Sequence, residues 1–264
     1  SGATAGSQFV WIPVGKIYTD EQKKESKTKT ITLGRYDFDE TTGEKSAYSG
    51  SYVEEDKGDT NTTLKNYGNT IAKNITNFKT SVVTNGGYYI GRYEARTTTT
   101  RNLKDDVLTQ ITERGIDQVY NFVTQPQAAG QAQNMYNSSK FTSDLINSYA
   151  WDTAIVFVQK CGTESNSSTY SKTDGLSSTG TNGPQTTGTN ILKVTSKVDK
   201  QCNIFDMAGN CREMTTETFS ISDIPCVSRG GCYNDNSRSY TSDRNYGDTS
   251  GAYSAYSFRP LLYL

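Results

Sequence analysis

The sequence predicts an α+β fold in a single domain, and three observations carry this prediction. Short β-prone segments bounded by Gly, Pro or Asn occur at 9–18, 86–95 and 257–264. One segment, 142–162, has apolar residues at helical spacing. The length of 264 residues fits one large domain or two small ones, and no internal repeat divides the chain.

The first part of the chain predicts two strands and a long polar insertion. Residues 1–8, "SGATAGSQ", are typical of a linker or an expression scar, so the domain is expected to span 9–264. "FVWIPVGKIY" (9–18) predicts a first strand and "KTITLGRYDF" (29–38) a second. Residues 39–70 are rich in Thr, Asn, Gly and charge, which indicates an insertion.

Next, the sequence predicts a short helix, a strand and a connection. The segment 63–78 favours a short helix, and "GGYYIGRYEA" (86–95) a strand opened by two glycines. The polar segment 125–137 is expected to be a connection, with Pro126 stopping any helix before it.

The best predicted helix is 142–162. Thr142 or Ser143 can cap its first turn, and Gly162 ends it. After it, 163–200 begins with Ser, Thr, Gly and Asn for almost 30 residues, which predicts a solvated polar insertion within the same domain.

The C-terminal part predicts strands that belong together. Segment 203–217 indicates a strand, a turn and a strand, 226–231 a short strand, and 257–264 a terminal strand. We expect all three segments in one antiparallel sheet. Asp206 and Asn210 are expected to satisfy backbone groups of the turn and not to face a ligand.

Composition excludes several functions. The 27 basic and 28 acidic residues nearly cancel, which gives no electrostatic case for nucleic acid as a partner. No 18-residue apolar run is present, so no membrane span is predicted. The chain has no His, which excludes Ser-His-Asp and Cys-His nucleophiles and His-bearing zinc sites.

The five cysteines contain no Cys-x-x-Cys pair, which argues against a zinc ribbon or a thioredoxin-type site. The favoured interpretation is that they are small buried apolar residues. The alternative is one structural disulfide among Cys202, Cys211 and Cys226, which would suit an extracellular protein.

Three segments, "GGYYIGRYEA", "NIFDMAGNCREM" and "SRGGCY…SFRP", stand in the order and rough spacing of a known family. The chain resembles formylglycine-generating-enzyme-like (sulfatase-modifying factor) domains from about Phe9 to Leu264. The resemblance implies a C-type lectin type of fold. The matching positions are Asp206, Met207, Gly209, Asn210, Glu213, Arg229, Gly230, Gly231, Phe258 and Arg259.

Departures from the family's sequence pattern argue against the family's enzymatic chemistry. The enzymes of this family have a cysteine pair shortly after Gly-Gly, where this chain has Asp235 and Tyr240. We therefore expect no catalytic residues and no enzyme activity. The fold often holds a structural calcium ion in loops of Asn, Asp and backbone carbonyls, so calcium stays open as a cofactor, without nominated ligands.

The segment 232–257, "CYNDNSRSYTSDRNYGDTSGAYSAYS", has an unusual composition. Twenty of its 26 residues are Tyr, Ser, Asn, Asp, Gly or Cys, and five of the chain's 18 Tyr lie in it. No Leu, Ile, Val, Met, Phe or Trp occurs there. A polar loop explains Asn and Gly. Tyr combined with small polar residues is typical of a binding surface, where Tyr supplies rigid amphipathic area.

The segment also resembles the C-terminal region of variable proteins of diversity-generating retroelements, a branch of the same family. There, adenine-directed errors at Asn codons yield Tyr, Asp, Ser, Gly and Cys. The resemblance implies a variable ligand-binding region at 232–257, displayed outside the cell on a bacterial surface or a phage particle, with a protein or cell-surface ligand. The expected ligand-binding residues are Cys232, Tyr233, Asn234, Asp235, Asn236, Ser239, Tyr240, Asp243, Asn245, Tyr246, Ser250, Tyr253 and Tyr256.

Three further expectations follow. The five Tyr rings of the segment should share one exposed surface, and Cys232 should be a surface residue that folding does not need. Arg244 is expected to be structural, by analogy with relatives. Two other functions remain as alternatives, a formylglycine-generating type of oxidase that uses other residues and a structural surface or pilus component without a specific ligand.

Overall fold

The computed structural model describes most of the chain. The described ranges are 4–18, 28–54, 75–99, 101–106, 108–138, 140–162, 200–219, 226–232, 240–247 and 251–264. The expected helix at 63–78 and the expected insertions at 39–70 and 163–200 lie largely outside these ranges. Of their described parts, 75–78 begins a helix that continues to Asn85, and 39–54 contains the short strand Lys45–Ala47. Within them, three helices and six small sheets form a mixed α+β fold, as the sequence predicts.

The largest sheet has five strands in the order β1-β6-β17-β10-β9. Its members are β1 (Phe9–Pro13), β6 (Gly87–Gly91), β17 (Pro260–Tyr263), β10 (Phe141–Leu145) and β9 (Asn137–Ser138). All of its recorded pairings are antiparallel. The sheet thereby joins the beginning, the middle and the end of the chain.

Helices α2 (Ile75–Asn85) and α4 (Ser148–Cys161) cover this sheet and enclose the main core. Helix α4 is shorter than predicted. Residues 141–145 form strand β10, and Asn147, whose side chain accepts a hydrogen bond from the Ala150 amide, caps the helix in place of Thr142 or Ser143. Gly162 ends the helix as expected.

The expectation of a connection at 125–137 is wrong, because residues 125–133 form helix α3 (Gln125–Gln133). Thr124 and Gln127 make a reciprocal capping box, in which each side chain bonds to the other residue's backbone amide. Pro126 lies in the first turn, where the missing amide proton costs nothing. Proline therefore starts this helix and does not block one.

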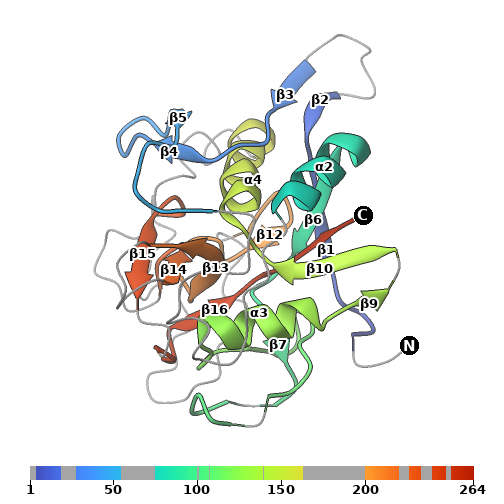
Figure 1. The fold of residues 1–264 in the computed structure, drawn as a ribbon, viewed down its shortest axis with the longest axis vertical. Coiled ribbons are helices and arrows are strands. Elements are labelled where there is room, and N and C mark those ends of the chain that lie inside the picture. The colour runs from blue at the N-terminus through green and yellow to red at the C-terminus, as the bar shows by residue number, and fades with distance from the viewer. Residues whose placement is uncertain are drawn as a thin grey trace.

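A second sheet of four strands, in the order β15-β14-β13-β16, forms the opposite side of the molecule from the labelled C-terminus (Figure 1). Its strands are β15 (Arg244–Gly247), β14 (Cys226–Arg229), β13 (Arg212–Thr218) and β16 (Tyr256–Phe258). Helix α3 and residues around Phe258 enclose a second core beside it.

The predicted single antiparallel sheet is only partly correct. Strands β13 and β14 do pair antiparallel, but β16 pairs parallel to β13, and β17 belongs to the five-stranded sheet. The chain changes sheets between Phe258 and Pro260, where buried Arg259 bonds to backbone carbonyls of Gly91 and Phe205. The first predicted strand of 203–217 is β12 (Ile204–Phe205), which pairs in a separate hairpin with β11 (Lys200–Gln201), just before the segment.

Three more two-stranded pairs complete the described fold. They are β2 (Gly15–Tyr18) with β3 (Thr28–Ile31), β4 (Tyr36–Phe38) with β5 (Lys45–Ala47), and β7 (Arg96–Thr97) with β8 (Gln118–Val119). Each of the first two predicted strands is therefore divided in two. Gly15, at φ +111°, lies just after the break between β1 and β2.

None of the helices that the structure describes is long and apolar enough to cross a membrane.

Candidate functional site

Strand β15 carries the centre of the predicted binding region to the edge of the four-stranded sheet. Among the described strands it pairs with β14 alone, from Cys226 opposite Gly247 to Arg229 opposite Arg244. Strand β16, at the other edge, carries Tyr256. Residues of 232–257 therefore lie in both edge strands of this sheet, β15 and β16.

A buried group of charges anchors β15, and we call it the arginine cluster. It consists of Arg35, Arg229 and Arg244 with Asp152 and Glu217. Arg244 donates to Glu217 through Nε at 2.9 Å and to Asp152 through Nη2 at 2.5 Å. Arg229 pairs with Asp152 at 2.6 Å, and Arg35 with Glu217. Arg244 is therefore structural, as expected.

The glycines of "RGG" place Arg229 in this cluster. Gly230 has φ +85°, and a Cβ on it would stand 2.6 Å from the carbonyl oxygen of Met207. The Gly209 amide donates to the Gly230 carbonyl at 2.8 Å, so the two sequence motifs interlock. Trp151 of α4 packs beside Arg229 and donates its indole hydrogen to the Thr241 carbonyl at 2.8 Å. Thr241, within the predicted binding region, is thus tied to α4.

The middle of the region exposes one aromatic ring on an aromatic support. Tyr246 is 54% exposed and stacks on Phe219 with ring centroids 5.3 Å apart. Phe219 in turn meets the edge of Tyr52 at 5.0 Å, and the Tyr52 hydroxyl donates to the Arg244 carbonyl at 3.5 Å. The supporting rings come from outside 232–257.

The end of the region exposes a second ring. Tyr253 is 63% exposed and lies against the half-buried Tyr256, with centroids 5.8 Å apart. The two rings line a small hollow of about 140 Å³ with Gly247 and Gly251. The Tyr256 hydroxyl lies 3.8 Å from where a Cβ of Gly247 would stand, so this hollow adjoins the end of β15.

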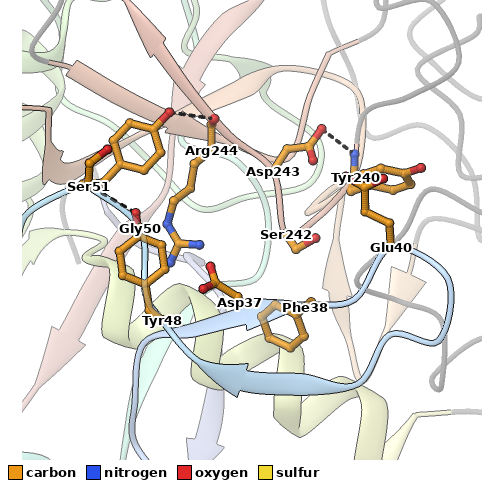
Figure 2. Close-up of a pocket in the computed structure, with 11 residues that line it drawn as sticks. Asp37, Phe38, Glu40, Tyr48, Gly50, Ser51, Tyr240, Ser242, Asp243 and Arg244 are labelled. Atoms are coloured by element: carbon orange, nitrogen blue, oxygen red, sulfur yellow. Dashed lines mark hydrogen bonds between the residues drawn. The ribbon is translucent and has the colours of Figure 1, made fainter.

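A larger cleft of about 310 Å³ lies at the other end of β15 (Figure 2). Residues 240–244 form one side of it, and residues of 37–52, around the β4–β5 hairpin, form the other. Tyr240 and Asp243 both line the cleft and are half-buried, and the Asp243 carboxylate accepts from the Tyr240 amide at 2.9 Å. Burial first, and then the charge of Glu40, raises the pKa of Asp243.

The structure therefore brings Tyr240, Asp243, Tyr246, Tyr253 and Tyr256 to the two hollows and the strand between them. Half-buried Asn245 lies between them on β15, opposite Ser228, whose hydroxyl donates to its carbonyl at 3.4 Å. We call this surface the tyrosine face. The remaining predicted residues, Tyr233, Asn234, Asp235, Asn236, Ser239 and Ser250, lie outside the described residues.

Cys232 does not belong to the tyrosine face, and the expectation of a surface thiol is wrong. It is 1% exposed and accepts a hydrogen bond from the Arg212 Nε at 3.4 Å. The reason is local, because Gly230 and Gly231 both have positive φ and turn the chain inward before it.

All five cysteines are free thiols in the structure. Cys211 and Cys226 are buried, which agrees with the favoured interpretation and not with a disulfide among Cys202, Cys211 and Cys226. Burial, followed by the charges of Glu94 and Cys232, raises the pKa of Cys211 well above its usual range. A thiol in this environment is a poor nucleophile.

A second buried group of charges lies behind β13, and we call it the carboxylate cluster. Among the described residues it contains Glu94, Glu113, Asp206 and Glu213 with two cations, Arg96 and Arg259. Arg259 holds Glu213 through two hydrogen bonds, one of them Nε to Oε2 at 2.9 Å, and Arg96 lies 3.7 Å from Asp206.

Burial, together with neighbouring carboxylates, raises the pKa values in this cluster. Burial raises the pKa of Glu94 well above its usual range, and the charges of Asp206 and Glu213 add to the rise. Burial also raises the pKa of Glu113, and it raises that of Glu213 to about 7 although Arg259 opposes it.

Asp206 and Asn210 are buried in this interior. Their φ angles are +57° and +55°, which few residues except Gly, Asn and Asp tolerate. Asn210 donates its side-chain amide to Glu94, so it bonds to a carboxylate and not to the backbone group that we expected. Among the described residues, no group of three or more acidic or cysteine side chains is arranged to hold a metal ion.

Sequence reasoning missed the residues outside 232–257 that border the tyrosine face. Asp37, Glu40, Tyr48, Tyr52 and Phe219 surround the tyrosine face, but they come from three ordinary polar segments. No local pattern distinguishes them, because their role depends only on which strand they stand beside.

Comparisons with known proteins leave the family open. No family model matches the chain, and no curated protein matches it. Among solved structures, the crystal structure of CarF matches with 14% sequence identity and a TM-score of 0.41, over 97% of this chain and 98% of that chain. A similarity at this level carries no argument about fold or function.

Proposed function

We propose that this protein is a ligand-binding display protein whose C-terminal region, 232–257, is varied by a diversity-generating retroelement. We further propose a C-type lectin type of fold from the formylglycine-generating-enzyme-like branch, displayed on a bacterial surface or a phage particle. In this proposal the described part of the region acts through the tyrosine face, and the target is a protein or cell-surface ligand.

One observation carries the proposal: the region exposes large aromatic rings on a backbone that is fixed from below. Tyr246 and Tyr253 are more than half exposed, yet β15 between the two hollows is held by two ion pairs of Arg244. Binding loses less free energy when the contact residues are already ordered. A rigid support with exposed Tyr, Asn and Asp is what a changeable binding surface requires.

Two physical points support the proposal against its rivals. An oxidase of the formylglycine-generating type needs a reactive thiol, but Cys211 and Cys232 are buried and the pKa of Cys211 is raised. A structural component without a ligand has no reason to keep Tyr246 and Tyr253 in solvent, since each ring could bury a large apolar area.

The first test separates exposed rings from core residues by substitution. Changing Tyr240, Tyr246 and Tyr253 together to Ser should reduce the free energy of unfolding by only about 0.5 kcal/mol per site, as for surface positions. Phe258→Ala and Leu261→Ala should each cost about 2–5 kcal/mol, because both side chains are fully buried. Urea denaturation measures both. If the triple change unfolds the protein, the tyrosines are core residues and the proposal fails.

The second test is genetic. The coding segment for 232–257, sequenced in several isolates, should vary at the codons for exposed residues such as Tyr246 and Tyr253. The codons for Arg229, Phe258 and Arg259, which are buried just outside it, should stay constant. Substitutions spread evenly along the gene would contradict the proposal, and so would flanking DNA without a near-copy of the segment beside a reverse transcriptase gene.

A further inference from the structure

The cleft at the start of β15 has one wall that the proposed diversification would not touch. Asp37, Phe38, Glu40, Tyr48 and Tyr52 lie outside 232–257, whereas Tyr240 and Asp243 lie inside it. The cleft's volume of about 310 Å³ is at the lower end for ligand pockets. It suits one side chain of a larger ligand better than a whole small molecule.

The charges that line the cleft are predominantly negative. Asp37, Glu40 and Asp243 are lining residues, and none of them forms an ion pair within the described part of the chain. Arg244 also lines the cleft, where it pairs with Asp152 and Glu217. Burial is the main cause of the raised pKa of Asp243; the charge of Glu40 adds to the rise, and Arg229 and Arg212 oppose it.

Aromatic rings in and next to the same hairpin already make cation–π contacts within the protein. The Lys45 ammonium lies 4.1 Å from the ring centroid of Tyr36, and the guanidinium groups of Arg35 and Arg244 lie 4.2 and 4.1 Å from that of Tyr48. These are cation–π distances. Phe38, Tyr52 and Tyr240 add further rings to the cleft wall, and none of them carries a cation of the described chain.

We propose that this cleft binds a guanidinium or ammonium side chain of a protein ligand, between the carboxylates of Asp37, Glu40 and Asp243 and the surrounding aromatic rings. The inference rests on the proposed binding function and makes it more specific. The fixed wall would select ligands with an exposed Arg or Lys, whereas changes at Tyr246 and Tyr253 would select among them.

A random 12-residue peptide library displayed on phage, selected on the whole protein at low salt, tests the inference. Enriched peptides should contain Arg or Lys above the frequency in the unselected library. Their affinity should fall by roughly tenfold or more in the variant D37N/E40Q, because a desolvated charge loses its partner. Affinity should also fall as salt rises, since exposed charges are screened.

A matched control is Glu44→Gln, which removes a charge from an exposed position of the same hairpin outside the cleft. It should leave peptide affinity unchanged, and thermal melts should show that both variants stay folded. Asn at 37 can still accept the two hydrogen bonds from Ser49, so D37N is expected to fold.

The outcomes separate the two proposals. Peptides that lose affinity in Y246S/Y253S, but lack basic residues or are indifferent to D37N/E40Q, would overturn the inference and leave the proposed function standing. Peptides that are indifferent to both variants, or the absence of any enrichment, would overturn both. A loss in E44Q equal to that in D37N/E40Q would show a general charge effect and would also overturn the inference.

Discussion

The two buried clusters are built from the same residue types but carry opposite excess charge. In the described residues, the arginine cluster sets Arg35, Arg229 and Arg244 against two carboxylates. The carboxylate cluster sets four acidic residues against Arg96 and Arg259. The first lies under the tyrosine face, and the second lies behind β13.

This difference decides how each cluster responds to pH. Arginine does not give up its proton in a protein, so an excess of arginine can be balanced only by carboxylates that stay ionised. An excess of buried carboxylates can instead be relieved by taking up protons. Burial is the main cause of the raised pKa values of Glu94, Glu113 and Glu213, and the charges of neighbouring carboxylates add to it. The tyrosine face is thus anchored on a cluster that depends on charge, and the carboxylate cluster depends on protonation.

The largest effect should come from Glu217→Gln in the arginine cluster. It removes one of two carboxylates and leaves Arg35 and Arg244 short of a partner in a buried site. We expect a loss of about 3–5 kcal/mol in the free energy of unfolding, as for other broken buried ion pairs. Urea denaturation at pH 7 measures it. A loss below about 1 kcal/mol would show that the cluster does not anchor β15.

The next effect is the pH dependence of the unmodified protein. Glu213 has a pKa of about 7 when folded and an ordinary value of 4.5 when unfolded. Between these values the folded state binds more protons than the unfolded state, so stability is fully present below pH 4.5 and is lost as pH rises through 7. Glu213 alone should contribute on the order of 3 kcal/mol.

The pKa values of Glu94 and Glu113 are also raised, so both residues should add to the loss of stability as pH rises. Free energies of unfolding measured from about pH 4.5 to 8 check the prediction. Stability that rises steadily over this range would contradict the assignment of protons to the carboxylate cluster.

Glu94→Gln is the corresponding substitution in the carboxylate cluster. It should lower the free energy of unfolding much less than Glu217→Gln. Within the part of the chain that the structure describes, the Oδ1 of Asn210 has no hydrogen-bond partner. A turned Asn210 amide could therefore accept a hydrogen bond from protonated Glu94, or from the side-chain amide of the glutamine that replaces it. We expect a loss below about 1 kcal/mol at pH 5 and a weaker pH dependence than in the unmodified protein. Equal losses for E94Q and E217Q in urea denaturation at pH 5 would remove the distinction between the clusters.

The smallest effect should come from Cys232→Ser, where the predicted binding region reaches the edge of the carboxylate cluster. The serine hydroxyl can accept the bond from Arg212, but it buries a more polar group at a site that is 1% exposed. We expect a loss of about 1 kcal/mol and an unchanged pH dependence. A thermal melt series over pH measures both. No loss of stability at all would contradict the burial of Cys232.

Local patterns in the sequence determined the α+β class, strands β1 and β6, the end of α4 at Gly162, and the clustering of Tyr before a buried terminal segment. These features depend on residues a few positions apart, which a sequence displays directly. The signal for α3 is also local, because Thr124, Pro126 and Gln127 start a helix together. The prediction of a connection there is wrong because it treats Pro126 only as a residue that ends helices.

The tertiary structure alone decided which tyrosines are exposed, which sheet each C-terminal strand joins, and how the charges pair. Arg244 and Asp152 are 92 residues apart in the chain, and Arg229 and Asp152 are 77 apart. No spacing rule connects such residues, since their meeting depends on how α4, β13 and β15 pack. The wall of the cleft that lies outside 232–257 comes from residues around the β4–β5 hairpin, and only the folded chain places them beside Tyr240.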